Sequence, residues 1–427
     1  MPSYLGAAAV WASMLAVVAT SASCSRAKPM EVHVPAYRVV PSPSLAFTRS
    51  ETPSMECPHA SSTRSGRVAV APRRYAALTA VAPIEDTRLG PPRFIDLPAR
   101  GDAMVLERPG AVDGAYEVRS TSGALATARS TNSTGIHVLA REEGFYVAGR
   151  AASWTGVLDP VNSGATVAFG GELLACAIQG EQLRTLVANN GLMTNDGPSD
   201  PDNTTAEMES LHGPNSAVRL GWVYRAVEPA VGAIDGGAHT VVALPSGRLV
   251  VLSPQGEPQS KEAVLALDVA IDPGATDLSI VPPFALLLYG GGDAGRLAKR
   301  RDAGAATSRL DARRPDGSLA WRASLSFLAT QPAIDGDHRV YVVGAGIAAL
   351  DLDGHTLWSS ASTLPLRATA FADGTLAVVR GSELQIVAND GSIKQSLRAV
   401  EELTTYPAIG PDGAVWVASA RTLYVAR

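Results

Sequence analysis

A glycine-rich loop is the first feature of this sequence whose spacing could do chemistry. Gly344, Gly346 and Ala349 follow the apolar run at 340–343 in a GxGxxA pattern. In dinucleotide-binding proteins this pattern opens a helix that holds a pyrophosphate. Here an Asp-Gly pair ending at Gly354 comes too soon for such a helix, and Asp-Gly between apolar runs is typical of a β-hairpin. The sequence therefore favours hairpins over a nucleotide site.

The three cysteines allow two kinds of chemistry. Cys24 follows the apolar and small-residue run at 5–22, and this arrangement resembles a bacterial lipoprotein signal in which the cysteine is acylated. If Cys24 carries lipid, Cys57 and Cys176 could form a disulfide in an oxidising compartment, or Cys176 could be a small core residue. The seven histidines show no metal-ligand spacing, so we expect no metal site.

Two polar segments could bind ligands or partners. Oxygen-bearing side chains crowd the segment 195–203, which either holds calcium or is a solvated loop. A basic segment follows a second glycine-rich pattern at 290–295, and we expect it to be an inserted loop that contacts an anionic partner or is simply solvated. The candidate interaction residues of the basic segment are Arg296, Lys299, Arg300 and Arg301.

Composition limits the classes of function. The chain has 427 residues, of which 46% are hydrophobic and 18% charged, with 40 Gly and 29 Pro. These values indicate a folded, β-rich protein with many turns. The net charge of -5 gives no basis for binding nucleic acid. We expect an export signal at 1–24, a Pro/Ser-rich tether with a possible closing strand at 25–96, and the folded domain at 97–427.

The elements that position these residues repeat along the chain. A shift of 37 residues lays 340–354 on 377–391 without a gap, and a backward shift of 174 residues lays 166–183 on 340–357. Glu383 and Glu172 then replace Gly346, which argues further against a phosphate site. A period near 37 with short strands is typical of propeller blades. Glycines end the hairpins at Gly123, Gly180, Gly256, Gly317, Gly354 and Gly391.

The segments DGSLAW and DGHTLW, at 316–321 and 353–358, resemble the pyrroloquinoline-quinone-like repeat. In that family a Gly-x-x-x-Trp motif docks one blade onto the next, which implies docking roles for Gly317, Trp321, Gly354 and Trp358. Ser260 and Gln395 replace Trp in other copies. The resemblance implies an all-β propeller of seven or eight four-stranded antiparallel blades. The last repeat stops after three strands, so we expect a strand from the amino-terminal side to complete the ring.

The same resemblance guides the expected function. Quinone dehydrogenases built on this repeat have adjacent cysteines, which this sequence lacks. In its repeat and its expected lipid anchor, the sequence resembles the propeller lipoprotein of the outer-membrane β-barrel assembly machinery. We therefore expect a non-catalytic scaffold without a cofactor, a monomer within a complex, bound to other envelope proteins and to the membrane through its lipid. The alternatives are a degenerate quinoprotein or hydrolytic propeller, and a calcium-dependent or carbohydrate-binding propeller.

Overall fold

A computed structural model describes much of the chain after residue 55. The described residues are 56–57, 67–84, 90–97, 103–108, 114–131, 133–140, 145–151, 155–158, 166–169, 172–179, 182–188, 206–212, 232–235, 240–253, 264–291, 307–331 and 333–427. These residues form β-strands and connecting turns, and none of them forms a helix. Within this part of the chain no helix has the length and apolar character needed to cross a bilayer.

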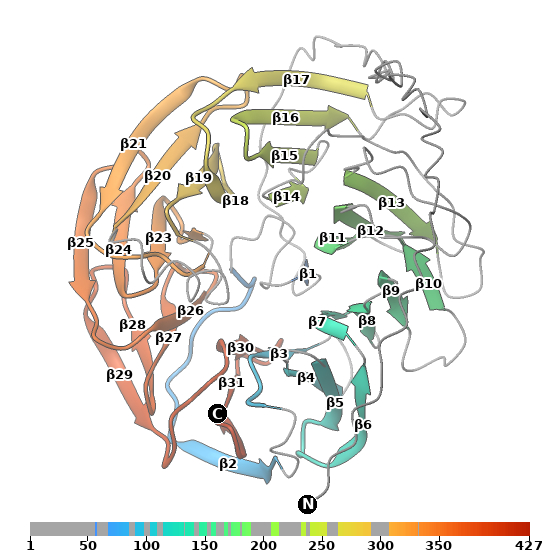
Figure 1. The fold of residues 1–427 in the computed structure, drawn as a ribbon. Coiled ribbons are helices and arrows are strands. Elements are labelled where there is room, and N and C mark those ends of the chain that lie inside the picture. Colours follow the sequence, from blue (N-terminus) through green and yellow to red (C-terminus); the bar gives the residue numbers. More distant parts are fainter. Residues whose placement is uncertain are drawn as a thin grey trace, which may run out of the picture. The chain divides into compact units, whose positions relative to one another are not determined.

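The described strands form eight four-stranded antiparallel sheets (Figure 1). Four of them use consecutive strands of the carboxyl-terminal half. Their strands are β14 (Gly232–Asp235), β15 (Thr240–Leu244), β16 (Arg248–Ser253) and β17 (Val264–Ala270); β18 (Ala275–Val281), β19 (Phe284–Tyr289), β20 (Ser308–Arg313) and β21 (Leu319–Leu325); β22 (Ile334–Asp335), β23 (Arg339–Val343), β24 (Gly346–Asp351) and β25 (Thr356–Ala361); and β26 (Leu366–Ala370), β27 (Leu376–Arg380), β28 (Glu383–Val387) and β29 (Ile393–Arg398).

Two sheets use consecutive strands of the amino-terminal half, and two others combine distant segments. The consecutive ones are β3 (Phe94–Asp96), β4 (Ala103–Arg108), β5 (Gly114–Ser120) and β6 (Leu125–Thr131), and then β7 (Ser133–Ala140), β8 (Phe145–Ala151), β9 (Thr155–Leu158) and β10 (Thr166–Phe169). The combined ones are β1 (Glu56–Cys57) with β11 (Glu172–Gln179), β12 (Gln182–Ala188) and β13 (Ala206–His212), and β30 (Ala408–Ile409), β31 (Val415–Ala418) and β32 (Thr422–Ala426) with β2 (Leu78–Pro83).

The first strands of successive sheets contact one another, which is the arrangement of a β-propeller. β14 contacts β18, β18 contacts β22, and β22 contacts β26, while β3 contacts both β7 and β30. A sheet can bury both faces against its neighbours where its strands are apolar on both sides, as in β19, where all six residues are buried. The all-β propeller predicted from the repeat is confirmed.

An amino-terminal strand completes the last sheet, as the sequence predicted. β2 pairs antiparallel with β32, with Leu78 opposite Ala426 and Pro83 opposite Thr422 (Figure 1). Pro83 is tolerated here because β2 is the outermost strand of its sheet. β2 covers the edge that β32 would otherwise expose. Both β2 and β3 precede residue 97, so the sheets begin earlier in the chain than the expected domain boundary.

The segment before β2 joins two sheets. The Val68 amide donates to the carbonyl of Ala370 on β26, and the Ala372 amide donates to the Val70 carbonyl, both at 2.9 Å. Val68 and Tyr75 then pack in the hydrophobic cluster between the β26–β29 sheet and the β30–β32 sheet. Residues 67–84, which we call the amino-terminal strap, therefore belong to the packed structure although they lie within the expected tether.

One of the predicted overlays is wrong. The backward shift of 174 residues places 166–169 and 172–179 as neighbouring strands of one blade, equivalent to β23 and β24. The structure instead makes 166–169 the last strand of the β7–β10 sheet and 172–179 the second strand of the next sheet. The overlay matched two short apolar runs, a pattern that neighbouring strands share whether or not they pair with each other.

Candidate functional site

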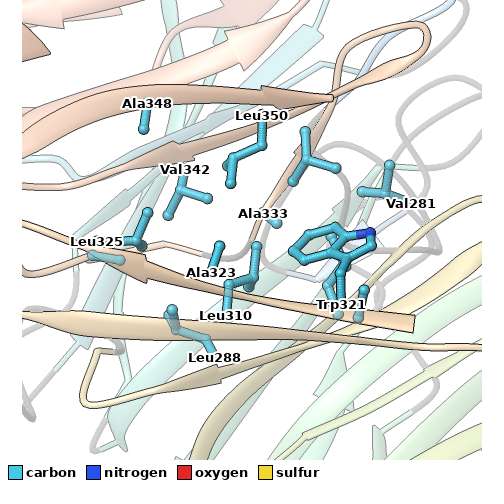
Figure 2. Close-up of a cluster of buried hydrophobic side chains, with 14 of the residues drawn as sticks. Val281, Leu288, Leu310, Trp321, Ala323, Leu325, Ala333, Val342, Ala348 and Leu350 are labelled. Carbon is cyan, nitrogen blue, oxygen red and sulfur yellow. The ribbon is translucent and has the colours of Figure 1, made fainter. Parts of the chain in front are cut away.

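The tryptophans predicted to dock blades lie at the contacts between neighbouring sheets. Trp321 on β21 is buried, and its indole N–H donates to the Leu352 carbonyl of the next sheet at 2.7 Å. Its ring lies against Gly354, where an added Cβ would come within 2.7 Å of Trp321 Cδ2. Figure 2 shows Trp321 among apolar side chains contributed by both sheets, including Val281 and Ala333.

The next pair of sheets repeats this contact. The Trp358 indole on β25 donates to the Asn389 carbonyl at 2.8 Å, and an added Cβ at Gly391 would lie 2.7 Å from its ring. Gly354 and Gly391 have φ values of +85° and +83°, so both turns require glycine for backbone conformation and for space. Each glycine therefore receives the tryptophan of the preceding sheet.

A β-bulge directly precedes Trp321, Trp358 and the residue at the equivalent position of the next sheet. The register shifts so that Ala320, Leu357 and Lys394 are the extra residues on β21, β25 and β29. A bulge changes the direction in which the following side chain leaves the sheet. The side chains that follow are Trp321, Trp358 and Gln395. The bulge is therefore part of the contact between sheets even where another residue replaces the tryptophan.

Other sheets dock without tryptophan. Gly317 has a φ of +80°, and an added Cβ there would lie 2.4 Å from Cγ2 of Val269 on β17. Gln395 accepts the Tyr75 amide at 3.1 Å and donates its side-chain amide to the Tyr75 carbonyl. Ser260, the other expected replacement, lies outside the described residues. The strap therefore takes part in docking at the Gln395 position.

A polar cluster joins the first strands of three sheets; it consists of Arg93, Phe94, Arg367, Thr369 and Tyr406. The Tyr406 amide donates to the Arg93 carbonyl at 3.0 Å, and the Tyr406 ring stacks on Phe94 with centroids 5.0 Å apart. Thr369 on β26 donates to the Pro407 carbonyl at 2.6 Å. Burial raises the pKa of Tyr406 and lowers that of Arg367, although neighbouring charges moderate both shifts.

Sequence reasoning missed this cluster, although one signal pointed to it. Tyr406 precedes Pro407 as Gln331 precedes Pro332 in the other copy of the Pro-Ala-Ile motif. Gln331 also bonds a neighbouring sheet. Its side-chain N–H donates to the Ala368 carbonyl at 3.1 Å, and its side-chain oxygen accepts the Ala368 amide at 3.2 Å. The residue before the proline thus connects its sheet to a neighbouring one in both copies.

Acidic side chains on first strands have bonding partners of their own. The Asp277 carboxylate on β18 accepts the Leu278 amide at 2.8 Å. Asp335 on β22 lies 3.5 Å from the guanidinium of Arg67 in the strap, and its side chain is 1% exposed. These contacts fix each carboxylate in place.

The sheet that contains β3 brings two further carboxyl groups together. Asp96 on β3 and Glu107 on β4 form a side-chain hydrogen bond, and burial raises the pKa of Asp96 well above its usual range. On the neighbouring strand, Glu117 lies 2.7 Å from Arg108 and 2.8 Å from Arg119, and all three side chains are buried. Each of these buried carboxyl groups therefore has a side-chain partner within its own sheet.

Arginines that follow the basic segment in the sequence form ion pairs with aspartates. Asp311 on β20 is fully buried and bonds Arg322 through both carboxylate oxygens, at 2.8 and 2.7 Å. Arg309 lies 3.1 Å from Asp311 and 3.0 Å from Asp272, and its guanidinium covers the Tyr289 ring at 3.8 Å. Arg309 therefore forms a fixed ionic network at the base of the 292–306 segment.

Several expected site residues lie outside the described residues. They are Cys24, the 195–203 segment, and the candidate interaction residues Arg296, Lys299, Arg300 and Arg301. Gly291 and Thr307, which flank the basic segment, are described, and they lie between β19 and β20. The segment is thus an insertion between two strands of one sheet, at the place where the glycine-rich pattern predicted an inserted loop.

One turn brings together side chains that could bind a metal ion. Single ligand atoms of Asp351, Asp353 and His355 lie within 4.8 Å of one another. The Asp351 carboxylate already accepts the amides of Asp353 and His355, at 2.9 and 2.8 Å, and meets the His355 ring at 3.1 Å. This pattern stabilises a solvent-exposed turn and gives no independent sign of a metal.

Comparison with known proteins supports the fold. No protein-family model matches the chain, and no curated protein matches it. Among solved structures, BamB from Moraxella catarrhalis is similar at 14% identity and a TM-score of 0.50, over 82% of this chain and 98% of that one. The computationally designed Ika8 protein is similar at 13% identity and a TM-score of 0.51, over 81% and 99%. At these identities the likeness shows a shared propeller fold and nothing finer.

Proposed function

We propose that this protein is an exported, lipid-anchored propeller scaffold that binds other envelope proteins and catalyses no reaction. Its envelope location rests on the apolar run that ends at Cys24. A role in assembling envelope or outer-membrane proteins rests on its resemblance, in repeat and anchor, to the propeller lipoprotein of the outer-membrane β-barrel assembly machinery. Fold similarity alone would not give this function.

The scaffold proposal rests mainly on the bonds that polar residues make on the first strands and just before them. Gln331, Thr369 and Tyr406 each bond the backbone of a neighbouring sheet, and Asp335 pairs with the strap. A propeller enzyme would direct such groups toward a substrate. Gln331, Thr369 and Tyr406 instead join sheets, which favours a rigid platform.

The proposed contact surface is the basic segment between β19 and β20. Arg296, Lys299, Arg300 and Arg301 give it positive charge that can attract an acidic protein surface. The ionic network of Arg309, Asp311 and Arg322 holds the strand at its base. A charged segment attached to a rigid strand can bind a partner without disturbing the packing of the sheets.

Affinity capture tests the proposal. Full-length protein carrying a carboxyl-terminal tag would be cross-linked in envelope preparations and its bound proteins identified, with a Cys24→Ala variant in parallel. We expect specific envelope proteins with the wild type, and release of the variant into the soluble fraction. A wild-type protein that captures nothing above background, or quinone-dependent alcohol or sugar oxidation by the purified protein, would contradict the proposal.

A further inference from the structure

Two cysteines that are distant in the sequence lie opposite each other in one sheet. β1 pairs antiparallel with β11, and Cys57 is the register partner of Cys176, beside the pair of Glu56 and Ala177. Directly opposed residues of an antiparallel ladder share a face of the sheet, with Cα atoms about 4.5 or 5.5 Å apart depending on the hydrogen-bonding site. Both spacings fall within the Cα range of about 4.4–6.8 Å found for disulfides.

We propose that Cys57 and Cys176 form a disulfide that attaches the amino-terminal segment to the sheet of β11, β12 and β13. The two thiols lose two protons and two electrons, and one S–S bond forms. A disulfide donor, either a dithiol oxidase or glutathione disulfide, accepts the electrons and is reduced to its thiols. The register brings the reacting residues together, and the proposal applies to any oxidising compartment.

Because β1 is short, a disulfide would help to hold it in the sheet. Glu56 and Cys57 form a strand of two residues, and they supply the first strand of a sheet whose other strands have seven or eight residues. A two-residue ladder has few hydrogen bonds to resist separation. A covalent bond at Cys57 would keep this strand in the sheet. β2, farther along the same segment, is held by its own ladder with β32.

Peptide mapping gives the direct test. Purified full-length protein is equilibrated with reduced and oxidised glutathione, its free thiols are alkylated, and it is digested with trypsin. Cleavage after arginine places Cys57 in the peptide 50–64, Cys176 in 151–184 and Cys24 in a third peptide. We expect 50–64 joined to 151–184 in the oxidised sample and both peptides alkylated after reduction.

An unfolded control separates proximity in the fold from simple thiol reactivity. The same protein in concentrated urea has the same cysteines without the β1–β11 ladder. We expect the ratio of linked to reduced protein to be at least about tenfold higher for the folded chain at one glutathione ratio. A Cys57→Ser variant should leave Cys176 alkylated and form no intramolecular link.

Three results would overturn the proposal. Both thiols could remain alkylatable in the folded protein under oxidising buffer, Cys24 could be linked to Cys57 or to Cys176, or folded and unfolded chains could oxidise equally. None of these results bears on partner capture, so the scaffold function and the disulfide can fail separately.

Discussion

At the scale of single residues, the sheets are joined by pairs in which a glycine receives a side chain from the preceding sheet. Gly354 receives Trp321, and Gly391 receives Trp358. Each pair combines a large apolar contact with one indole hydrogen bond to a backbone carbonyl. The sequence motif revealed these positions because the same chemistry recurs at the same spacing.

Alanine at Gly354 should be more destabilising than alanine at Gly274. Both glycines have positive φ, +85° and +86°, so backbone strain of about 1–2 kcal/mol applies to each. An added Cβ at Gly354 meets Trp321, whereas Gly274 has no atom within 4 Å of that position. We expect Gly354→Ala to lower the free energy of unfolding by at least about 1 kcal/mol more than Gly274→Ala in urea titrations. Equal losses would refute the close docking of Trp321.

Tyr341 should make the folded state less stable at high pH. Its side chain is fully buried, and burial raises its pKa to about 12 from the ordinary value of 10.0. Below pH 10 the group is protonated in both states. As pH rises from about 10 to about 12 the unfolded state loses this proton first, so the free energy of unfolding falls.

A Tyr341→Phe variant isolates this contribution. Two pKa units correspond to about 2–3 kcal/mol of differential interaction. We therefore expect urea midpoints of the wild type to fall more steeply than those of the variant between pH 10 and pH 12. Parallel profiles would show that Tyr341 does not carry the shift.

At the scale of elements, the amino-terminal strap closes the junction between two sheets. Gln395 bonds both the amide and the carbonyl of Tyr75, and the Tyr75 hydroxyl donates to the Gly413 carbonyl at 2.9 Å. Earlier in the strap, the Val68 amide donates to the Ala370 carbonyl of β26. The strap therefore links the outer β2 strand to the first strand β26.

Gln395→Ala should loosen the strap. Removing the side-chain amide leaves the Tyr75 backbone without these two bonds, each worth about 1 kcal/mol. We expect faster tryptic cleavage after Arg73 and Arg74 in the native protein. Lys394→Ala, an exposed neighbour on β29, is the matched control and should leave the rate unchanged. Similar rates in all three proteins would contradict the role of Gln395.

Sequence analysis predicted some elements well and others poorly, for physical reasons. The hairpin over 340–358 and the closing strand before residue 84 were predictable, because apolar runs with Asp-Gly turns and an unpaired last repeat are local signals. The pairing of β1 with β11 had no such signal, since two residues carry no periodicity. The polar cluster around Tyr406 depends on which first strands meet, which no single segment encodes.

At the scale of the whole molecule, the fold and the function rest on different kinds of observation. The sheets, their order and their docking establish a propeller. Propellers serve many functions, so the scaffold proposal depends on how this chain uses its polar groups and on its charged insertion. The candidate contact residues of that insertion can be changed without touching any docking contact described above.

Partner capture by a basic-segment variant is the most direct test of the scaffold proposal. The variant changes Arg296, Lys299, Arg300 and Arg301 to Ser. A control variant makes the same change at four exposed cations elsewhere in the described chain, which are Arg380, Lys394, Arg398 and Arg421. Both lose four positive charges, so a nonspecific charge effect would appear in both. We expect equal melting temperatures, at least about tenfold weaker capture by the basic-segment variant and unchanged capture by the control. Equal capture of envelope proteins by the wild type and both variants would contradict a partner site on this segment.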